Sequence, residues 1–272
     1  MTERPLLWVI IASILLALPL LFFAFGNNNS DTPGDNGNDN NNGEEQNDSE
    51  NNNDIDPDKA FWGVDSASLT TEELYACVVD NFGTPEVWGR YLGDKENVSF
   101  GLTSDEADYL HSNDVKILLI YNHFSDATGY ENGMEQARNA IELAEELEVP
   151  DGKAIFADIE PDYPVDKEFI KGWFDGMKDS AYKPGIYGVF AEEQELYPIY
   201  SEAAEENEEL KNETIIWTAY PQEGITTEEN APEYNPGAPE GSYLLGWQYG
   251  IDAEACNIDT NLFKGELFEY LW

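Results

Sequence analysis

From residue 60 onward, short apolar runs alternate with longer amphipathic stretches. The runs are rich in aromatic and β-branched residues, which is typical of strands. The predicted strands are 61–65, 87–92, 116–121, 154–159, 185–190, 214–220, 243–249 and 257–259. The predicted helices are 71–81, 104–112, 131–148, 166–180 and 192–210. Thr70, Thr103 and Asp166 are expected at N-cap or first-turn positions, where their side-chain oxygens accept backbone N–H groups.

Alternating strands and helices predict a parallel sheet with helices packed outside it. Eight strands within residues 60–272 predict a (β/α)8 TIM barrel. The last two intervals between strands lack a helical pattern, and residues 226–242 read TTEENAPEYNPGAPEGS, a loop rich in Pro and Gly. The barrel is therefore expected to be somewhat irregular in its last third.

The N-terminal segment differs from the rest of the chain. Residues 6–25 carry no charge and have the length that crosses a bilayer, so they predict a transmembrane anchor. Arg4 precedes this segment and favours a cytoplasmic N-terminus. The alternative is a cleaved signal peptide ending near Ala24-Phe25-Gly26. The protein is thus expected at the cell membrane with an extracellular domain, or secreted if the segment is cleaved.

A polar segment separates the apolar stretch from the predicted barrel. Residues 27–58 are mostly Asn, Asp, Gly, Glu and Ser, with ten acidic residues and no basic one. Such a segment has nothing to form a core, and it predicts a disordered, self-repelling linker. The expected organisation is an anchor or signal in 1–26, a linker in 27–58 and a barrel in 59–272.

The chain is strongly acidic. The chain has 56 acidic and 13 basic residues, a formal charge of −43. Binding to nucleic acid or to anionic lipid by charge attraction is therefore not expected. Residues 59–272 alone hold 45 acidic and 12 basic residues, about −33, so the linker does not account for the acidity. A saline habitat, in which salt screens the repulsion, is one explanation; an ordinary acidic surface is the other.

The chain has two cysteines, Cys77 and Cys256. In an exported protein an even number of cysteines favours a disulfide. This bridge would join the start of the domain to its end, which barrel closure brings together. The alternative is a pair of buried thiols.

Polar and aromatic side chains gather at the predicted strand ends, where barrel enzymes have their active sites. They include Asp65, Arg90, Tyr91, Tyr121, Asn122, His123, Asp158, Glu160, Tyr187, Trp217, Tyr220, Trp247, Gln248, Tyr249, Asp259 and Asn261. Carboxylates surrounded by aromatic rings and amides are typical of a sugar-binding site, because rings stack on sugar faces and amides bond to hydroxyls. Alternatively, the Tyr and Trp side chains belong to the core.

Asp158 and Glu160 form the most informative pair. They end the apolar run AIFADIEP, and residues i and i+2 of a strand point to the same side. Their Cα atoms would be about 6.5 Å apart. Their carboxyl groups could then approach the separation of about 5–5.5 Å used by retaining glycosidases. One would stay protonated and the other ionised. The alternative is that both cap the next helix or bind a structural cation.

The sequence leaves two roles undecided for each of two basic side chains near this site, Arg90 and His123. If Arg90 points inward, it should pair with Asp65 or Asp158 and hold that partner ionised. A salt bridge at the rim is the other possibility. His123 could contact substrate or be a loop residue with its own partners.

Four motifs in order resemble those of the glycoside-hydrolase-like barrels related to family 25 lysozymes (muramidases). They are Gly63-Val64-Asp65, Asp158-Ile159-Glu160, Trp247-Gln248-Tyr249 and Asp259-Thr260-Asn261-Leu262-Phe263. The segments WGRYLG and GLTSDEADYL look closer to a bacterial branch of this superfamily that is called glycoside-hydrolase-like. The activity of that branch is less firmly established than that of the true lysozymes. The resemblance covers residues 60 to about 265.

The resemblance implies Glu160 as the general acid and Asp158 as the nucleophile, or as support for a substrate acetamido group that acts as one. It also implies that Asp65 and Asp259 complete the acidic cluster. Ser66-Ala67-Ser68 departs from the lysozyme pattern after the first strand, and the loop 221–242 reshapes the sixth and seventh units. These departures bear on the peptidoglycan substrate more than on the fold.

Two functions follow from these observations. The first is an exported, membrane-tethered glycosidase that acts on peptidoglycan or a related polysaccharide. The second is a non-catalytic barrel that binds glycan or wall material. Both predict a monomer with a glycan or cell-wall polymer as its partner, no cofactor, no metal and no nucleic acid.

Overall fold

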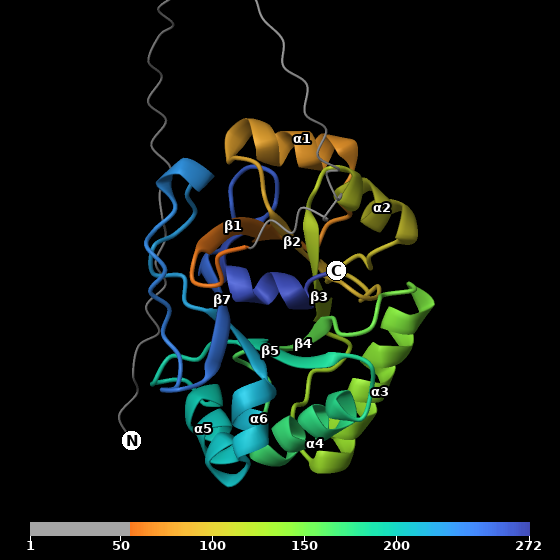
Figure 1. The fold of residues 1–272 in the computed structure, drawn as a ribbon, viewed down its shortest axis with the longest axis vertical. Helices are drawn as coiled ribbons and strands as arrows, with labels where there is room; N and C mark the ends of the chain where they lie inside the picture. The colour runs from red at the N-terminus through yellow and green to blue at the C-terminus, as the bar shows by residue number, and fades with distance from the viewer. Residues whose placement is uncertain (1–54) are drawn as a thin grey trace, which may run out of the picture. The chain divides into compact units, whose positions relative to one another are not determined.

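The computed structural model describes residues 55–272, and the fold is a closed barrel of eight strands with helices around it (Figure 1). The strands are β1 (Ala60–Asp65), β2 (Val87–Tyr91), β3 (Lys116–Tyr121), β4 (Ala154–Ile159), β5 (Lys183–Gly188), β6 (Ile215–Ala219), β7 (Tyr243–Gly250) and β8 (Asp259–Lys264). The α-helices are α1 (Glu72–Asn81), α2 (Ser104–Ser112), α3 (Tyr130–Glu146), α4 (Lys167–Lys178), α5 (Leu196–Glu206) and α6 (Glu208–Glu213). Two short 3₁₀ segments are η1 (Glu228–Asn230) and η2 (Gly265–Tyr270). The eight-stranded barrel and its alternation of strands and helices are thus confirmed.

The last strand corrects the prediction of an all-parallel barrel. Each strand from β1 to β7 is parallel to the next, but β8 is antiparallel to both β7 and β1. The segment 251–258 between β7 and β8 contains no helix. A parallel crossover needs a dozen or more residues, so this connection is long enough only for an antiparallel return. Strand β8 also begins at residue 259, where the predicted strand ended.

The barrel has an inner and an outer apolar layer. Inside it, Ile120, Phe156, Trp217 and Phe263 belong to one buried cluster. The opposite faces of the strands pack against the helices in a second cluster. Leu267 of η2 belongs to the inner cluster, and Figure 1 shows η2, in dark blue, crossing one end of the barrel. That end is therefore closed, and the site must lie at the other end, where β1–β7 finish.

Two helix boundaries differ from those predicted. Thr71, not Thr70, is the N-cap of α1, and its side chain accepts from the Leu74 N–H at 3.2 Å. The predicted helix 192–210 is two helices, because Asn207 has an extended backbone (φ −140°, ψ 100°). Its side chain caps α6. Thr103 and Asp166 are N-caps as expected.

The first described residues lie against the closed end of the barrel. The backbone N–H of Glu266 donates to the oxygen of Pro57, and Lys264 Nζ donates to the oxygen of Asp58. The predicted anchor and the predicted linker up to residue 54 lie outside the described residues. Within residues 55–272, no helix combines the length and apolarity needed to cross a membrane.

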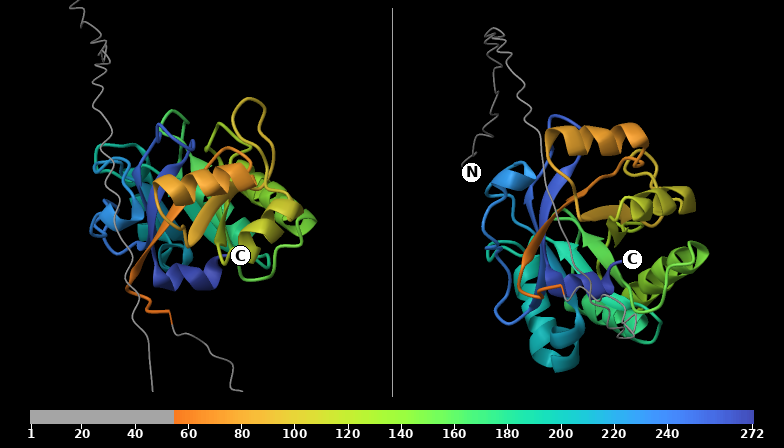
Figure 2. Two further views of the ribbon diagram at one scale, coloured as in Figure 1. Left: turned by 90° about the horizontal axis from the view of Figure 1, so that it is seen from above. Right: turned by 45° about the horizontal axis from the view of Figure 1, so that its top comes forward.

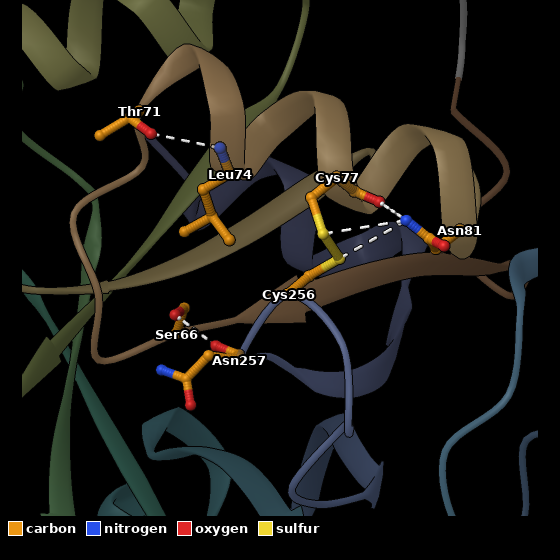
Figure 3. The surroundings of a disulfide bond; sticks show 7 residues. All are labelled: Ser66, Thr71, Leu74, Cys77, Asn81, Cys256 and Asn257. Carbon is orange, nitrogen blue, oxygen red and sulfur yellow. Dashed lines mark hydrogen bonds between the residues drawn. A yellow bond between two sulfur atoms is a disulfide. The ribbon is translucent and has the colours of Figure 1, made fainter.

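Cys77 of α1 and Cys256 of the β7–β8 loop form a disulfide with their Cα atoms 5.7 Å apart (Figure 3). Next to it, Ser66 Oγ donates to the backbone oxygen of Asn257 at 2.8 Å. The disulfide and this hydrogen bond fasten the β7–β8 loop to α1 and to the residue that follows Asp65. Both contacts lie at the open end of the barrel.

Candidate active site

A cavity of about 160 Å³ opens at the end of the barrel opposite η2. It is lined by Asp65, Tyr91, Ile120, Asp158, Glu160, Tyr187, Trp217, Gln248, Ile251 and Asp259. Eight of these are among the strand-end residues named from the sequence: Asp65, Tyr91, Asp158, Glu160, Tyr187, Trp217, Gln248 and Asp259. The structure therefore brings these predicted residues together around one cavity.

Strand alternation and one glycine position Asp65 inside the barrel. Asp65 is the last residue of β1 and lies opposite Gly89 of β2 in the sheet. A Cβ atom on Gly89 would stand 2.6 Å from Cβ of Asp65, closer than real Cβ atoms approach. Only glycine at position 89 therefore leaves room for the inward carboxyl of Asp65.

Asp65 accepts two amide hydrogen bonds on one oxygen. Asn261 Nδ2 donates to its Oδ2 at 2.7 Å, and Gln248 Nε2 donates to the same atom at 3.0 Å. Burial raises the pKa of the Asp65 carboxyl, whereas these two hydrogen bonds and the charge of Arg90 lower it. The donors favour the ionised form and partly offset the burial of the charge.

Each amide is itself held by an aromatic side chain. Trp217 Nε1 donates to Asn261 Oδ1 at 2.9 Å, and the Tyr187 hydroxyl donates to Gln248 Oε1 at 2.7 Å. The rings of Tyr187 and Trp217 contact each other, with centroids 4.4 Å apart. This network fixes both amide groups with their N–H groups toward Asp65. Asn261, predicted as a site residue, is completely buried and supports the cavity from beneath.

Asp158 and Glu160 lie side by side at the end of β4, and burial acts on both carboxyls. Asp158 is 4% exposed, and no N–H or O–H group of the described residues donates to its Oδ1. Burial raises the pKa of Asp158 well above its ordinary value, and the charge of Glu160 raises it further. Burial also raises the pKa of Glu160, while a hydrogen bond with Asp158 lowers it. Burial therefore favours the protonated form of both carboxyls, and the hydrogen bond between them lets one proton be shared.

Asp259 completes the acidic cluster from the start of β8. The Asp252 N–H donates to its Oδ1 at 2.7 Å, and Gln248 Nε2 donates to its Oδ2 at 3.2 Å. Burial, together with the charge of Asp65, raises the pKa of Asp259 to about 8. Asp259 therefore carries a proton at neutral pH, which limits the negative charge gathered in the cavity.

Lys95, in the loop between β2 and α2, is the cation that acts on the acid pair. Its Nζ donates to the backbone oxygens of Asn122 and Phe124 at 2.6 and 3.1 Å. Its charge lowers the pKa of both Asp158 and Glu160. The sequence analysis did not single out Lys95, because it lies in a loop beyond the predicted strand ends.

Arg90 takes neither of the two predicted positions. It points away from the cavity and is completely buried between β2 and α2. Its Nε lies 2.6 Å from Oε1 of Glu106, and its guanidinium also donates to the backbone oxygens of Ser66 and Phe100. Because Gly89 and Tyr91 point inward, Arg90 between them must point outward. It acts on Asp65 only through its charge.

Four predicted sugar-contacting aromatic residues also lie outside the cavity. The Tyr121 hydroxyl donates to Gln136 Oε1 of α3 at 2.8 Å, so this ring packs behind the sheet. Trp247 Nε1 donates to the backbone oxygen of Tyr220 at 2.9 Å, and both rings pack into the outer cluster. The Tyr249 hydroxyl accepts from Trp62 Nε1 at 3.0 Å. These four rings, including that of Tyr220, have the core role that was the alternative prediction.

Of the remaining strand-end residues, some line the cavity and others lie outside it. His123 is exposed and packs against Tyr121, away from the cavity. Asn122 is buried and donates to Ser99 Oγ at 3.0 Å. Tyr91 and Trp217, which the sequence placed at strand ends, line the cavity. No sequence pattern pointed to Ile251, because only the fold of the β7–β8 loop brings it to the mouth of the cavity.

The acidic cluster shows no arrangement suited to a metal. Among residues 55–272, no group of three or more His, Cys, Asp or Glu side chains could hold a metal ion. The carboxyls are instead satisfied by amide donors, by a shared proton and by the charge of Lys95. The chemistry available to these residues is proton transfer and stabilisation of positive charge.

Residues 85–230 match the family described as the Rv2525c-like, glycoside hydrolase-like domain. The chain belongs to this family. The resemblance found in the sequence is thereby confirmed. No curated protein matches the chain.

Among solved structures, an uncharacterized protein from B. stearothermophilus is similar to this glycoside hydrolase-like chain at 41% identity and a TM-score of 0.76. The match covers 78% of this chain and all of that one. A muramidase from Acremonium alcalophilum has 14% identity and a TM-score of 0.50, covering 77% of this chain and 99% of its own. The spore cortex lytic enzyme SleM from Clostridium perfringens has 10% identity and a TM-score of 0.50, covering 76% and 68%. The last two likenesses concern the fold alone.

Proposed function

We propose that this protein is an exported, membrane-tethered glycoside hydrolase that cleaves peptidoglycan or a related polysaccharide. The observation that carries the proposal is the pair formed by Asp158 and Glu160. The two carboxyls lie side by side at the edge of a cavity whose other lining residues include aromatic rings, an amide and further carboxyls, and burial raises the pKa of both. Membership of a glycoside hydrolase-like family supports it. The muramidase and lytic enzyme with the same fold suggest wall polysaccharide as the first substrate class to test.

Glu160 is the proton donor in this proposal. It follows β4 directly and is less buried than Asp158, so it can reach a glycosidic oxygen while Asp158 stays beneath it. When Glu160 gives its proton to the leaving oxygen, the bond to the anomeric carbon breaks and positive charge develops on the sugar. Water then adds to the anomeric carbon, and the proton that it releases returns to the pair formed by Asp158 and Glu160. Asp158 thus shares protons with Glu160, which differs from the role as nucleophile that the resemblance implies.

Asp65 stabilises the positive charge in this proposal. Its Oδ2 accepts two fixed amide N–H groups, and these donors together with the charge of Arg90 favour its ionised form. Donors that are fixed before the reaction need no rearrangement as the charge develops. Asp259 lies beside Gln248 and limits the total charge. The aromatic faces of Tyr91 and Trp217 would contact the sugar ring.

The test is hydrolysis of purified peptidoglycan and of a panel of other glycans. Glu160→Gln keeps the shape of the side chain and removes the proton, so turnover should fall by about 10²–10⁴-fold. Asp158→Asn should cause comparable loss, and Asp259→Asn a smaller one. Glu146→Gln, which changes an exposed carboxyl on α3, is the matched control. Circular dichroism checks the fold of each variant.

The proposal is wrong if folded Glu160→Gln keeps wild-type turnover. If the wild type binds wall glycan but cleaves nothing in the panel, the chain is instead the non-catalytic binding barrel that the sequence also allowed. The acid pair would then serve recognition alone.

A further inference from the structure

The loop between β2 and α2, residues 92–103, exposes two large apolar side chains at the mouth of the barrel. Phe100 is 59% exposed and Val98 is 57% exposed. Figure 2 (left) shows this loop, in yellow, rising at the end of the barrel opposite η2. Neighbouring exposed apolar side chains on a surface of this acidity indicate a contact surface rather than ordinary surface composition.

The backbone of Phe100 is fixed on both sides. Its N–H donates to the oxygen of Ala67 at 2.9 Å, and its oxygen accepts from Nη2 of Arg90 at 3.0 Å. The next N–H, of Gly101, donates to Asp94 Oδ1 at 2.7 Å. Arg90 is completely buried and bonded to Glu106, so its hydrogen bond to Phe100 is held in place. The ring is therefore held outward by a rigid support.

A groove of about 460 Å³ lies beside this ring. Its walls include Ser68, Asp94, Asn97, Ser99, Phe100 and Asn257. An aromatic face with hydroxyl, amide and carboxylate groups around it suits a sugar ring, whose C–H face is apolar and whose rim carries hydroxyls. The Asn257 side chain is already oriented, because its Nδ2 donates to Ser68 Oγ at 2.9 Å.

The groove and the acidic cavity are lined by residues of the same loops or of adjoining segments. Ala67 and Ser68, two and three residues after Asp65, line one side of the groove. The β7–β8 loop contributes Ile251 to the cavity and Asn257 to the groove. Lys95 lines the groove, and its charge acts on Asp158 and Glu160. A chain of sugars passing over the carboxyls could therefore extend along the same loops.

We propose that this groove is a second sugar-binding subsite, with Phe100 as the platform for a ring of the same polymer that occupies the acidic cavity. The subsite rests on the proposed function and specifies it further. It makes the protein selective for a polymer over a short fragment, because only a polymer spans cavity and groove together. Binding energy gained in the groove holds the polymer at the acid pair.

The test compares Phe100→Ala with Val79→Ala, which truncates an exposed apolar side chain on α1 outside the groove. Kinetics are measured on long peptidoglycan glycan strands and on a disaccharide of the same linkage, with the purified full chain. For Phe100→Ala we expect kcat/KM on long strands to fall about five- to tenfold, mainly through KM. Turnover of the disaccharide should stay within about twofold of wild type. Phe100→Trp keeps an aromatic platform, so its kcat/KM on long strands should stay near the wild-type value.

A second measurement separates this inference from the proposed hydrolysis. Cosedimentation with insoluble peptidoglycan reports binding whether or not bonds are cleaved. If the wild type binds without cleaving, and Phe100→Ala weakens binding while Glu160→Gln does not, the subsite stands and the hydrolase proposal fails. If Phe100→Ala matches Val79→Ala in both turnover and binding, the subsite is overturned and the hydrolase proposal is untouched. A wild type that neither binds nor cleaves overturns both.

Discussion

The raised pKa of Asp259 predicts a pH-dependent gain in stability when this carboxyl is replaced by an amide. In the folded protein the pKa of Asp259 is raised to about 8, whereas in an unfolded chain an aspartate titrates near its ordinary value of about 3.9. Between these two pH values the folded protein retains a proton that the unfolded chain has lost. Its free energy of unfolding therefore falls as pH rises from about 4 to about 8. Asp259→Asn has no carboxyl to titrate at this position, so it removes this pH-dependent loss of stability.

The size of the effect follows from the shift. One pKa unit corresponds to about 1.4 kcal/mol, so the full linkage at pH 7 would be about 4 kcal/mol. Solvent screening of the partly exposed side chain reduces this figure, to about half. The new amide nitrogen also faces Gln248 Nε2, which donates to Asp259 at 3.2 Å, and losing that bond costs about 1 kcal/mol. We expect a net gain of about 1–2 kcal/mol at pH 7 and none, or a small loss, at pH 4.

Urea unfolding at constant ionic strength measures this difference between pH 4 and pH 8. Urea is preferable to guanidinium chloride, which is a salt and would screen the acidic cluster. Glu146→Gln removes one exposed negative charge and serves as the control for the general effect of net charge. A stability difference between Asp259→Asn and wild type that stays flat across this pH range would refute the assignment of a buried, protonated Asp259.

Three further predictions concern stability. Reducing the disulfide of Cys77 and Cys256, which are 179 residues apart, should lower the free energy of unfolding by about 2–5 kcal/mol; labelling of two free thiols in the native oxidised protein would contradict the bridge. Arg90→Met should cost about 3–5 kcal/mol because it leaves Glu106 buried without its partner, and Glu106→Gln in the same chain should recover part of the loss in urea unfolding. A domain of formal charge about −33 should melt at higher temperature in 1 M than in 0.05 M NaCl, and an unchanged midpoint would mean that its acidic groups are too widely spaced to repel.

The parts of the site found from sequence are those that depend only on where a strand ends. Asp65, Asp158 and Glu160 each lie at or directly after the end of a predicted strand, and parallel strands of a barrel finish at one end. Which way a side chain points is a different question. Barrel strands are buried on both faces, so they read as continuous apolar runs without the alternation that would tell inside from outside.

Arg90 and Tyr121 illustrate this limit. Both lie near the ends of strands and were predicted as site residues, yet both point to the helices. Moving one residue along a strand exchanges the two faces. The neighbour Tyr91 lines the cavity instead. The register of β1 against β2, with Asp65 opposite Gly89, determines this choice and belongs to the folded barrel.

The direction of β8 decides whether Asp259 joins the acidic cluster. Asp65 of β1 lies opposite Asp259 in the sheet because β8 runs against β1, so the first residue of β8 meets the last residue of β1. A parallel β8 of the same residues would carry Lys264 to the open end and Asp259 to the closed end. Asn261 would then lose its contact with Asp65, and that carboxyl would lose one of its two amide donors. The short, helix-free segment 251–258 thus determines the position and the protonation of the cluster, because it is too short to return the chain for a parallel strand.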